Sequence, residues 1–246
     1  MKAAMSGFDL RAVARELNEF SGAYVKKAYM PHYEQIVLRI NPKGMDQFDL
    51  VLVRGARIYT SNRDRPMPMT PPPFAMVLRK HLKNARMTGV RQLGFDRVLC
   101  FDFDTKFGQY HLYVEVFRDG NIILTDEEDT IIQPLTHASY AGRTLKKGVT
   151  YQPPPAAMDP HEMELEQLAE MFATSDRDLV STLGGKVNLG GTHANAVCAL
   201  AGMDANIDTQ VADTEKVHAA LQSLLSDLEQ SNEGFLLLKS DKENTN

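Results

Sequence analysis

Cysteine and tryptophan are scarce in this sequence of 246 residues, which contains two cysteines and no tryptophan. Cys100 and Cys198 lie far apart along the chain, one in a strand-like pattern and the other in a helix-like pattern. Such cysteines are typical of buried thiols in a cytosolic protein. We therefore expect neither a disulfide nor a cysteine metal site.

Long hydrophobic runs are also missing, since no apolar stretch approaches the roughly 18 residues that a membrane span requires. The opening stretch, MKAAMSGFDLRAVAREL, soon carries charge and lacks the apolar core of a secretion signal. A composition of 43% hydrophobic and 24% charged residues is typical of globular proteins. These features predict a cytoplasmic protein with no membrane partner.

Familiar catalytic motifs are absent as well. The sequence has no G-x-S-x-G, H-E-x-x-H or C-x-x-C pattern. The stretch LGGKVNLGG fails as a phosphate loop because Val180 and Val187 stand where glycine and Ser or Thr are required. The seven histidines are scattered, and none pairs persuasively with a second metal ligand at helical spacing. We expect no catalytic residues, no metal and no cofactor.

Charge is divided unevenly along the chain, although the net charge is only −5. Residues 1–150 contain 22 Lys and Arg against 16 Asp and Glu, a net of +6. Residues 151–246 contain 5 against 16, a net of −11. Such an asymmetry suggests two units with different surfaces, and the basic one is where a polyanion would bind.

The periodicity predicts an α+β protein. In the basic half, Ser6 begins a helix with a capping-box pattern that includes Asp9, and residues 23–61 alternate as antiparallel strands. A proline-rich connector leads to a helix over residues 74–85, and the strand LGFDRVLCFDF and a hairpin at Asp119-Gly120 follow. The expected units are a mixed domain over 1–150, an all-helical domain over 156–232 and the start of a truncated following region over 233–246.

Two charged groups have both a structural and a functional interpretation. On the helix at 74–85, Arg79, Lys80, Lys83 and Arg86 form either a solvated face or a set of phosphate contacts. Asp96 and Arg97 open a strand as either an ion pair at a turn or a pair that grips a ligand. The residues alone favour the structural role for Asp96, Arg97 and the helix-capping Asp9.

Residues 184–202 carry two glycines, Gly190 and Gly191, between two short helical patterns. A helix-hairpin-helix would use their backbone N–H groups to bind a phosphate. A simple helical hairpin would bind nothing, and the acidic surroundings favour that reading. The sequence leaves both interpretations open.

Several collinear stretches resemble the NFACT family, among them ELNEFSGAYVKKAYMP, PPPFAMVLRKHLKNARMTGVRQLGFDRVLCFDF, GNIILTDEEDTII, GVTYQPPP and LGGKVNLGGTHANAVCALAGMD. This family comprises the ribosome quality-control tailing factors, bacterial RqcH and eukaryotic NEMF. Some members carry the label fibronectin-binding protein A. The resemblance spans nearly the whole chain and rests on many motifs together.

The resemblance implies a mixed domain related in fold to the N-terminal domain of formamidopyrimidine-DNA glycosylases, followed by a helix-hairpin-helix domain. It also implies a function without catalysis: binding a large ribosomal subunit obstructed by peptidyl-tRNA and recruiting aminoacyl-tRNA for alanine-type tailing of the stalled peptide. Whether two copies of the chain associate stays open.

Residues of the family that handle tRNA fall on Asp9, Asp96 and Arg97, and we expect both carboxylates to orient the Arg97 guanidinium. The full-length family continues into a coiled coil and a C-terminal RNA-binding domain that are not present here. Two rival functions are a DNA-repair glycosylase or lyase and a fibronectin-binding adhesin. Lys2 and Ala3 replace the glycosylase nucleophile at the start of the chain, and the missing secretion signal disfavours an adhesin.

Overall fold

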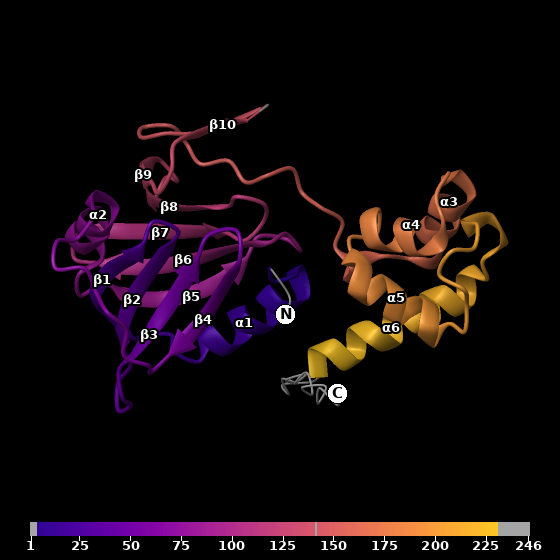
Figure 1. The fold of residues 1–246 in the computed structure, drawn as a ribbon, viewed down its shortest axis with the longest axis horizontal. Coiled ribbons are helices and arrows are strands. Elements are labelled where there is room, and N and C mark those ends of the chain that lie inside the picture. The colour runs from indigo at the N-terminus through magenta and orange to yellow at the C-terminus, as the bar shows by residue number, and fades with distance from the viewer. Residues whose placement is uncertain (1–3, 141, 231–246) are drawn as a thin grey trace, which may run out of the picture.

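The computed structural model describes residues 4–140 and 142–230, and it has the expected α+β class. A large antiparallel sheet with two helices forms the first part of the chain, and a group of helices forms the second (Figure 1). An extended segment connects them. The region expected to begin at residue 233 lies outside the described residues.

The main sheet has nine strands in the order β4-β3-β2-β1-β5-β6-β7-β8-β9, and every neighbouring pair is antiparallel. Each connection but one joins strands that are consecutive in sequence. The exception is the seam between β1 and β5, where only Tyr24 and Arg86 pair. The strands are β1 (Tyr24–His32), β2 (Gln35–Asn41), β3 (Phe48–Val53), β4 (Arg57–Ser61), β5 (Arg86–Gln92), β6 (Val98–Thr105), β7 (Gly108–Glu115), β8 (Asn121–Asp126) and β9 (Ile131–Pro134).

Both halves of the sheet pack on one core. Leu38 of β2 and Leu50 of β3 belong to the same buried cluster as Leu99, Phe101 and Phe103 of β6. One face of each half of the sheet covers this shared core. The alternation of β6 that the sequence predicts is confirmed.

The opposite face of β6 has its own small core. Val98 and Cys100 pack with Tyr113, Tyr151 and Leu145. A short hairpin of β10 (Ala138–Tyr140) and β11 (Arg143–Leu145) contributes Leu145 to this cluster. The sheet is therefore covered on this face by a segment that follows β9.

The hairpin predicted at Asp119-Gly120 is present between β7 and β8. Gly120 has φ +56°, and a Cβ there would lie 2.2 Å from the Gly55 backbone nitrogen. The Gly55 N–H donates to the Glu115 carbonyl at 3.0 Å. Because the two backbones touch, Gly120 must remain a glycine.

Two helices accompany the sheet, α1 (Gly7–Asn18) and α2 (Pro73–Leu82). The predicted capping box of α1 is confirmed: Ser6 accepts from the Asp9 N–H, and the Asp9 carboxylate accepts from the Ser6 N–H at 2.6 Å. The prediction that the second helix continues to residue 85 was wrong. It ends at Leu82, because Lys83 is already extended and the chain turns at Asn84 with φ +59° into β5.

The helical part begins with a 3₁₀ turn and ends with the longest helix. Its elements are η1 (Pro160–Glu162), α3 (Leu165–Thr174), α4 (Leu179–Gly185), α5 (Gly190–Leu200), η2 (Thr209–Val211) and α6 (Thr214–Gln230). Leu183, Val197 and Leu221 are among its buried core residues. Across the residues that the structure describes, none of the helices combines the length and apolar character of a membrane span.

Two aromatic residues of the sheet part complete the core of the helical part. Phe8 of α1 and Phe95 of the β5–β6 turn are buried in the same cluster as the α3–α6 side chains. Their rings meet edge to face with centroids 4.6 Å apart. The two parts of the chain are therefore joined by apolar packing as well as by the connecting segment.

Candidate nucleic-acid interface

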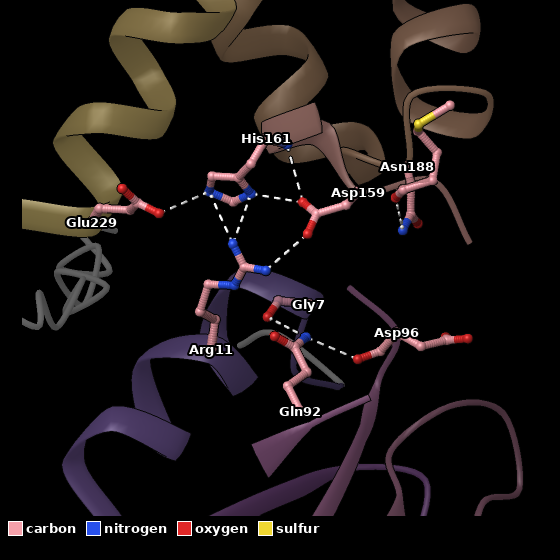
Figure 2. Close-up of polar contacts among 9 residues, drawn as sticks. Gly7, Arg11, Gln92, Asp96, Asp159, His161, Asn188 and Glu229 are labelled. Atoms are coloured by element: carbon pink, nitrogen blue, oxygen red, sulfur yellow. Dashed lines mark hydrogen bonds and ion pairs between the residues drawn. The ribbon is translucent and has the colours of Figure 1, made fainter. Parts of the chain in front are cut away.

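Asp96 and Arg97 lie in the turn between β5 and β6. The Asp96 N–H donates to the Leu93 carbonyl at 3.1 Å, and Gly94 adopts φ +57° inside this turn. The Gln92 amide donates to the Asp96 carbonyl at 2.8 Å and to the Gly7 carbonyl at 3.0 Å (Figure 2). One side chain thus fixes the turn against the start of α1.

The side chains of Asp96 and Arg97 do not form an ion pair in the described part of the chain. The Asp96 carboxylate instead accepts from the Arg97 backbone N–H at 3.0 Å. Burial raises the pKa of Asp96 above its ordinary value, although this bond and the charges of Arg97 and Arg143 oppose the rise. The ion pair between the Asp96 and Arg97 side chains, which the residues alone favoured as a way to stabilise the turn, is therefore not formed.

The raised pKa predicts that Asp96 costs stability when it is ionised. An acid whose folded-state pKa lies above its unfolded value destabilises the fold at high pH, and the penalty disappears below the unfolded value of 3.8. Asp96→Asn keeps an oxygen for the Arg97 N–H and should raise Tm by about 1–3 °C at pH 7. Thermal unfolding should show this gain fading as the pH falls toward 4; a gain that grows there would contradict the assignment.

A cavity of about 450 Å³, which we call the Arg97 cleft, opens beside the turn. Its lining residues come from four separate segments: Asp96 and Arg97, then Phe117, Arg118, Asp119 and Gly120, then Tyr140 and Arg143, and finally Pro154, Pro155 and Ala157. Three arginines thus line one cavity. The Tyr140 side chain is 49% exposed, so its ring is accessible to a ligand.

The three arginines of the cleft differ in their bonding. Arg143 donates to the Glu115 carboxylate in a very short contact, and both side chains are almost fully buried. By contrast, the guanidinium groups of Arg97 and Arg118 make no hydrogen bond or ion pair with any described residue. Two cations of the cleft are therefore available to an anionic ligand, and the third holds the wall in place.

Glu115 and Arg143 support the cleft from behind. Burial raises the pKa of Glu115, whereas the charge and hydrogen bond of Arg143 and the hydroxyl of Tyr151 lower it. Tyr151 donates to Glu115 at 3.1 Å, and the Tyr151 ring stacks on Tyr113 with centroids 4.0 Å apart. This group fixes the end of the β10–β11 hairpin, which carries Tyr140.

Asp9 does not join Asp96 and Arg97, contrary to our expectation. Its carboxylate caps α1, and no hydrogen bond or ion pair connects it to either residue within the described ranges. Asp9 lines a different cavity, of about 180 Å³, together with Arg11 and His161. The Asp96 carboxylate extends away from α1 (Figure 2). The expectation that both carboxylates orient the Arg97 guanidinium is therefore not met by the described contacts: Asp96 accepts from the Arg97 backbone N–H, and Asp9 caps α1.

Polar contacts from α1 join the sheet part to the helical part around that second cavity (Figure 2). Arg11 pairs with Asp159 at 2.9 Å and contacts the His161 ring, which lies 3.4 Å from Glu229. Burial alone would raise the pKa of Asp159, but hydrogen bonds from His161 and the Arg11 charge bring it below its usual range. Arg15 donates to the Glu229 carbonyl at 2.6 Å.

The four basic residues expected on one face of α2 do not share a face. Arg79 donates to the Ala28 carbonyl at 2.7 Å and lies over the Tyr29 ring, 5.4 Å from its centroid. Arg86 lies in β5 and pairs with Asp104 at 2.9 Å. Lys80 and Lys83 are exposed at the end of α2. Only the two lysines retain the expected place at the end of α2, since Arg86 is exposed but lies in β5; the phosphate contacts of the four residues stay a prediction.

The glycines predicted at the helical hairpin begin α5. Gly190 has φ +70° and Asn188 has φ +64°, so the chain reverses sharply between α4 and α5. Gly190 and Gly191 are exposed, and a Cβ on either would meet no described atom within 4 Å. The helix–hairpin–helix arrangement is present, and binding of a phosphate by its backbone stays a prediction.

Sequence reasoning missed one group of chemically active side chains. Cys100, Asp102 and His111 offer ligand atoms that all lie within 4.8 Å of one another. The search at helical spacing could not find them, because Asp102 and His111 are partners across β6 and β7. The alternation that places Cys100 and Asp102 on one face was visible in the sequence, but the register with β7 was not.

Comparison with known proteins gives consistent matches. The family described as NFACT N-terminal and middle domains matches residues 6–246. The "Archaeal Rqc2 homolog aRqcH" of Methanocaldococcus jannaschii is 31% identical over 98% of this chain, and human "Ribosome quality control complex subunit NEMF" is 35% identical over 72%. The chain spans 38% of the archaeal relative's length and 17% of the human one's.

Solved structures give the same fold. The N-terminal part of the fibronectin/fibrinogen-binding protein from Streptococcus suis superimposes with a TM-score of 0.70 at 26% identity, covering 89% of this chain and 85% of that one. The fibrinogen-binding protein from Staphylococcus aureus has a TM-score of 0.69 at 17% identity, covering 91% and 82%. DNA glycosylase complexes from Lactococcus lactis reach 0.48 at 12% identity and carry no functional argument.

Proposed function

Because this chain belongs to the NFACT family of ribosome quality-control factors, we propose that it binds tRNA through the Arg97 cleft while seated on a large ribosomal subunit that carries peptidyl-tRNA. In this role it recruits aminoacyl-tRNA for template-free, alanine-type tailing of the stalled peptide in the cytoplasm. The ribosome's peptidyl-transferase centre makes the peptide bond. The chain itself is then an adaptor and not an enzyme.

The observation that carries the proposal is the composition of the Arg97 cleft. Arg97 and Arg118 offer two guanidinium groups with no partner among the described residues, and Tyr140 offers an exposed ring beside them. Single-stranded RNA is recognised by charge-assisted bonds to phosphates and by stacking of unpaired bases on aromatic rings. The cleft has both features within one cavity.

Each residue that lines or supports the cleft has a distinct role in this proposal. Arg97 and Arg118 hold phosphate oxygens, and Tyr140 stacks on a base. Asp96 accepts from a base amino group or a ribose 2′-OH, which is how a carboxylate contributes to RNA recognition. The buried Glu115–Arg143 pair keeps Tyr140 in position.

Arg97→Ala should weaken tRNA binding by about 10- to 100-fold, because one charge-assisted hydrogen-bonding group is lost. The slope of log K against log salt should become less negative by about 0.7, the contribution of one phosphate of a single strand. Binding is measured by fluorescence anisotropy with labelled tRNA at four salt concentrations. Far-UV circular dichroism should show an unchanged fold.

Arg63→Ala is the matched control, because Arg63 is an exposed arginine in the connector between β4 and α2, outside the cleft. It removes the same charge and should change affinity by less than about twofold. Equal losses in the two variants would mean that only the net charge matters. That result would contradict a specific role for the cleft.

A second candidate function is binding of fibronectin or fibrinogen, favoured by the names of the S. suis and S. aureus proteins that share the fold. Immobilised fibronectin and fibrinogen discriminate between the candidates. We expect no saturable binding to either ligand under conditions in which tRNA binds. Saturable binding that survives Arg97→Ala would favour the second function.

A further inference from the structure

Three side chains of β6 and β7, on the sheet face opposite the main core, have the chemistry of a metal site. Cys100 and Asp102 lie two residues apart on β6, and His111 of β7 is the cross-strand partner of Asp102. The Cys100 sulfur lies 3.3 Å from Asp102 Oδ1, and His111 Nδ1 lies 2.6 Å from the same oxygen. We propose that Cys100, Asp102 and His111 bind a zinc-like divalent cation.

The donor set selects the class of ion. Thiolate, imidazole and carboxylate are the three ligand types that Zn²⁺ takes in proteins, at about 2.3, 2.0 and 2.0–2.2 Å respectively. Mg²⁺ and Ca²⁺ prefer oxygen ligands, so a sulfur and a nitrogen in the same set disfavour them. One sulfur, one nitrogen and one oxygen therefore point to zinc or a chemically similar ion.

The separations are close to those that a tetrahedral site requires. Metal–ligand distances of that size place the ligand atoms about 3.3–3.6 Å from one another. The sulfur–oxygen distance of 3.3 Å is within about 0.3 Å of the value for that pair. The imidazole and carboxylate must separate by about 0.8 Å when a metal binds, so the mostly buried His111 ring or the Asp102 carboxylate must shift by that amount.

A neighbouring arginine orients the carboxylate. Arg91 Nε donates to Asp102 Oδ2 at 3.2 Å, which leaves Oδ1 directed at Cys100 and His111. Outer partners of this kind fix the geometry of a ligating carboxylate. The positive charge of Arg91 is compatible with a bound dication. The two charges of the ion are cancelled by the Cys100 thiolate and the Asp102 carboxylate, so the whole group carries one net positive charge.

The fourth position would face solvent. Asp102 and His111 line a cavity of about 280 Å³ together with Thr88, Arg91, Asp104 and Gln109. A water in this cavity can complete a site that has three protein ligands. Binding exchanges the thiol proton for the metal: the Cys100 S–H bond breaks, a sulfur–metal bond forms, and one proton leaves to solvent. The His111 proton moves from Nδ1 to Nε2.

Cobalt titration of the whole chain tests the proposal, since tetrahedral Co²⁺ bound to thiolate gives a near-ultraviolet charge-transfer band and strong visible bands. We expect one equivalent of Co²⁺ to produce these bands and one equivalent of Zn²⁺ to remove them. Cys100→Ser should abolish the charge-transfer band. Zn²⁺ affinity, measured by competition with a chromophoric chelator, should fall at least about 100-fold, beyond what loss of an outer partner usually costs.

Cys198→Ser is the matched control, because Cys198 is also buried but lies in α5, outside this group. It should bind Co²⁺ and Zn²⁺ as the unaltered chain does. His111→Asn gives a second reading if Cys100→Ser fails to fold by circular dichroism, and it too should lose Zn²⁺ binding. Absence of a charge-transfer band in the unaltered chain, or unchanged affinity in a folded Cys100→Ser or His111→Asn variant, would overturn the proposal.

Discussion

Arg143→Met should lower the free energy of unfolding by about 3–5 kcal/mol, because it leaves the Glu115 carboxylate buried without its cation. The Glu115 side chain is 1% exposed and that of Arg143 is 8% exposed, so water cannot replace the lost partner. Met preserves most of the buried volume of the arginine stem. The loss therefore reports the uncompensated charge and not a cavity.

The pH dependence of this loss follows from Glu115. Burial already raises the pKa of Glu115, and the removal of Arg143, which lowers it, must raise the pKa further. A raised folded-state pKa means that the penalty is absent at low pH and grows as the pH rises through that value. Urea unfolding of the variant should thus show a larger deficit at pH 8 than at pH 5.

Two further variants make this prediction specific. Glu115→Gln introduced into Arg143→Met removes the stranded charge and should recover at least about 1 kcal/mol at pH 8. Arg118→Met makes the same substitution at an exposed arginine of the cleft and should change stability by no more than about 0.5 kcal/mol. A deficit that is the same at both pH values, or that Glu115→Gln deepens, would contradict the buried-pair argument.

Phe95→Ala should destabilise the chain by about 3–5 kcal/mol, as expected for a large aromatic side chain removed from a core. Phe95 is 2% exposed, and it packs against Phe8, the His161 ring at 5.5 Å and the Arg11 guanidinium at 5.0 Å. It therefore belongs to the core of the helical part while lying on a turn of the sheet part.

The same substitution should uncouple the two parts of the chain. With Phe95 removed, the described links that remain from α1 include the packing of Phe8, the Arg11 contacts with Asp159 and His161, and the Arg15 bond to the Glu229 carbonyl. Calorimetry should resolve a separate transition of the helical part at lower temperature. Limited proteolysis should cut faster between residues 152 and 159, the segment that joins the two parts.

Phe107→Ala is the matched control, because the Phe107 side chain is 77% exposed at the tip of the β6–β7 hairpin. It should change the free energy of unfolding by no more than about 0.5 kcal/mol and leave proteolysis unchanged. A Phe95→Ala variant that unfolds in one transition with a loss below about 1 kcal/mol would show that the aromatic joint does not couple the two parts.

The turn between β5 and β6 shows how far the sequence could lead. The alternating pattern of β6, the strand that follows the turn, correctly placed Leu99, Phe101 and Phe103 on one face of the sheet and Cys100 on the other. The neighbours of Arg97 in the cleft could not be predicted from the sequence, because Arg118, Tyr140 and Pro154 come from segments 21 to 57 residues further along the chain. No local pattern encodes such an approach.

Errors in the sequence reasoning have equally physical causes. The helix at α2 was predicted to reach residue 85, whereas it ends at Leu82 and Asn84 turns the backbone into β5, which carries Arg86. Asp9 was expected near Arg97 because both were assigned to one site by resemblance. Its capping bond with Ser6 holds the carboxylate at the helix end instead.

The sequence by itself determined the features that depend on residues close together along the chain: the capping box of α1, the alternation of β6 and the hairpin at Gly120. Its collinear motifs also determined the family. The tertiary structure alone decided which side chains share a site. It brought Arg97 together with Arg118 and Tyr140, paired Arg143 with the buried Glu115, and set His111 opposite Asp102. Local periodicity fixes which face a residue occupies, but strand register and the path of long connections fix what that face meets.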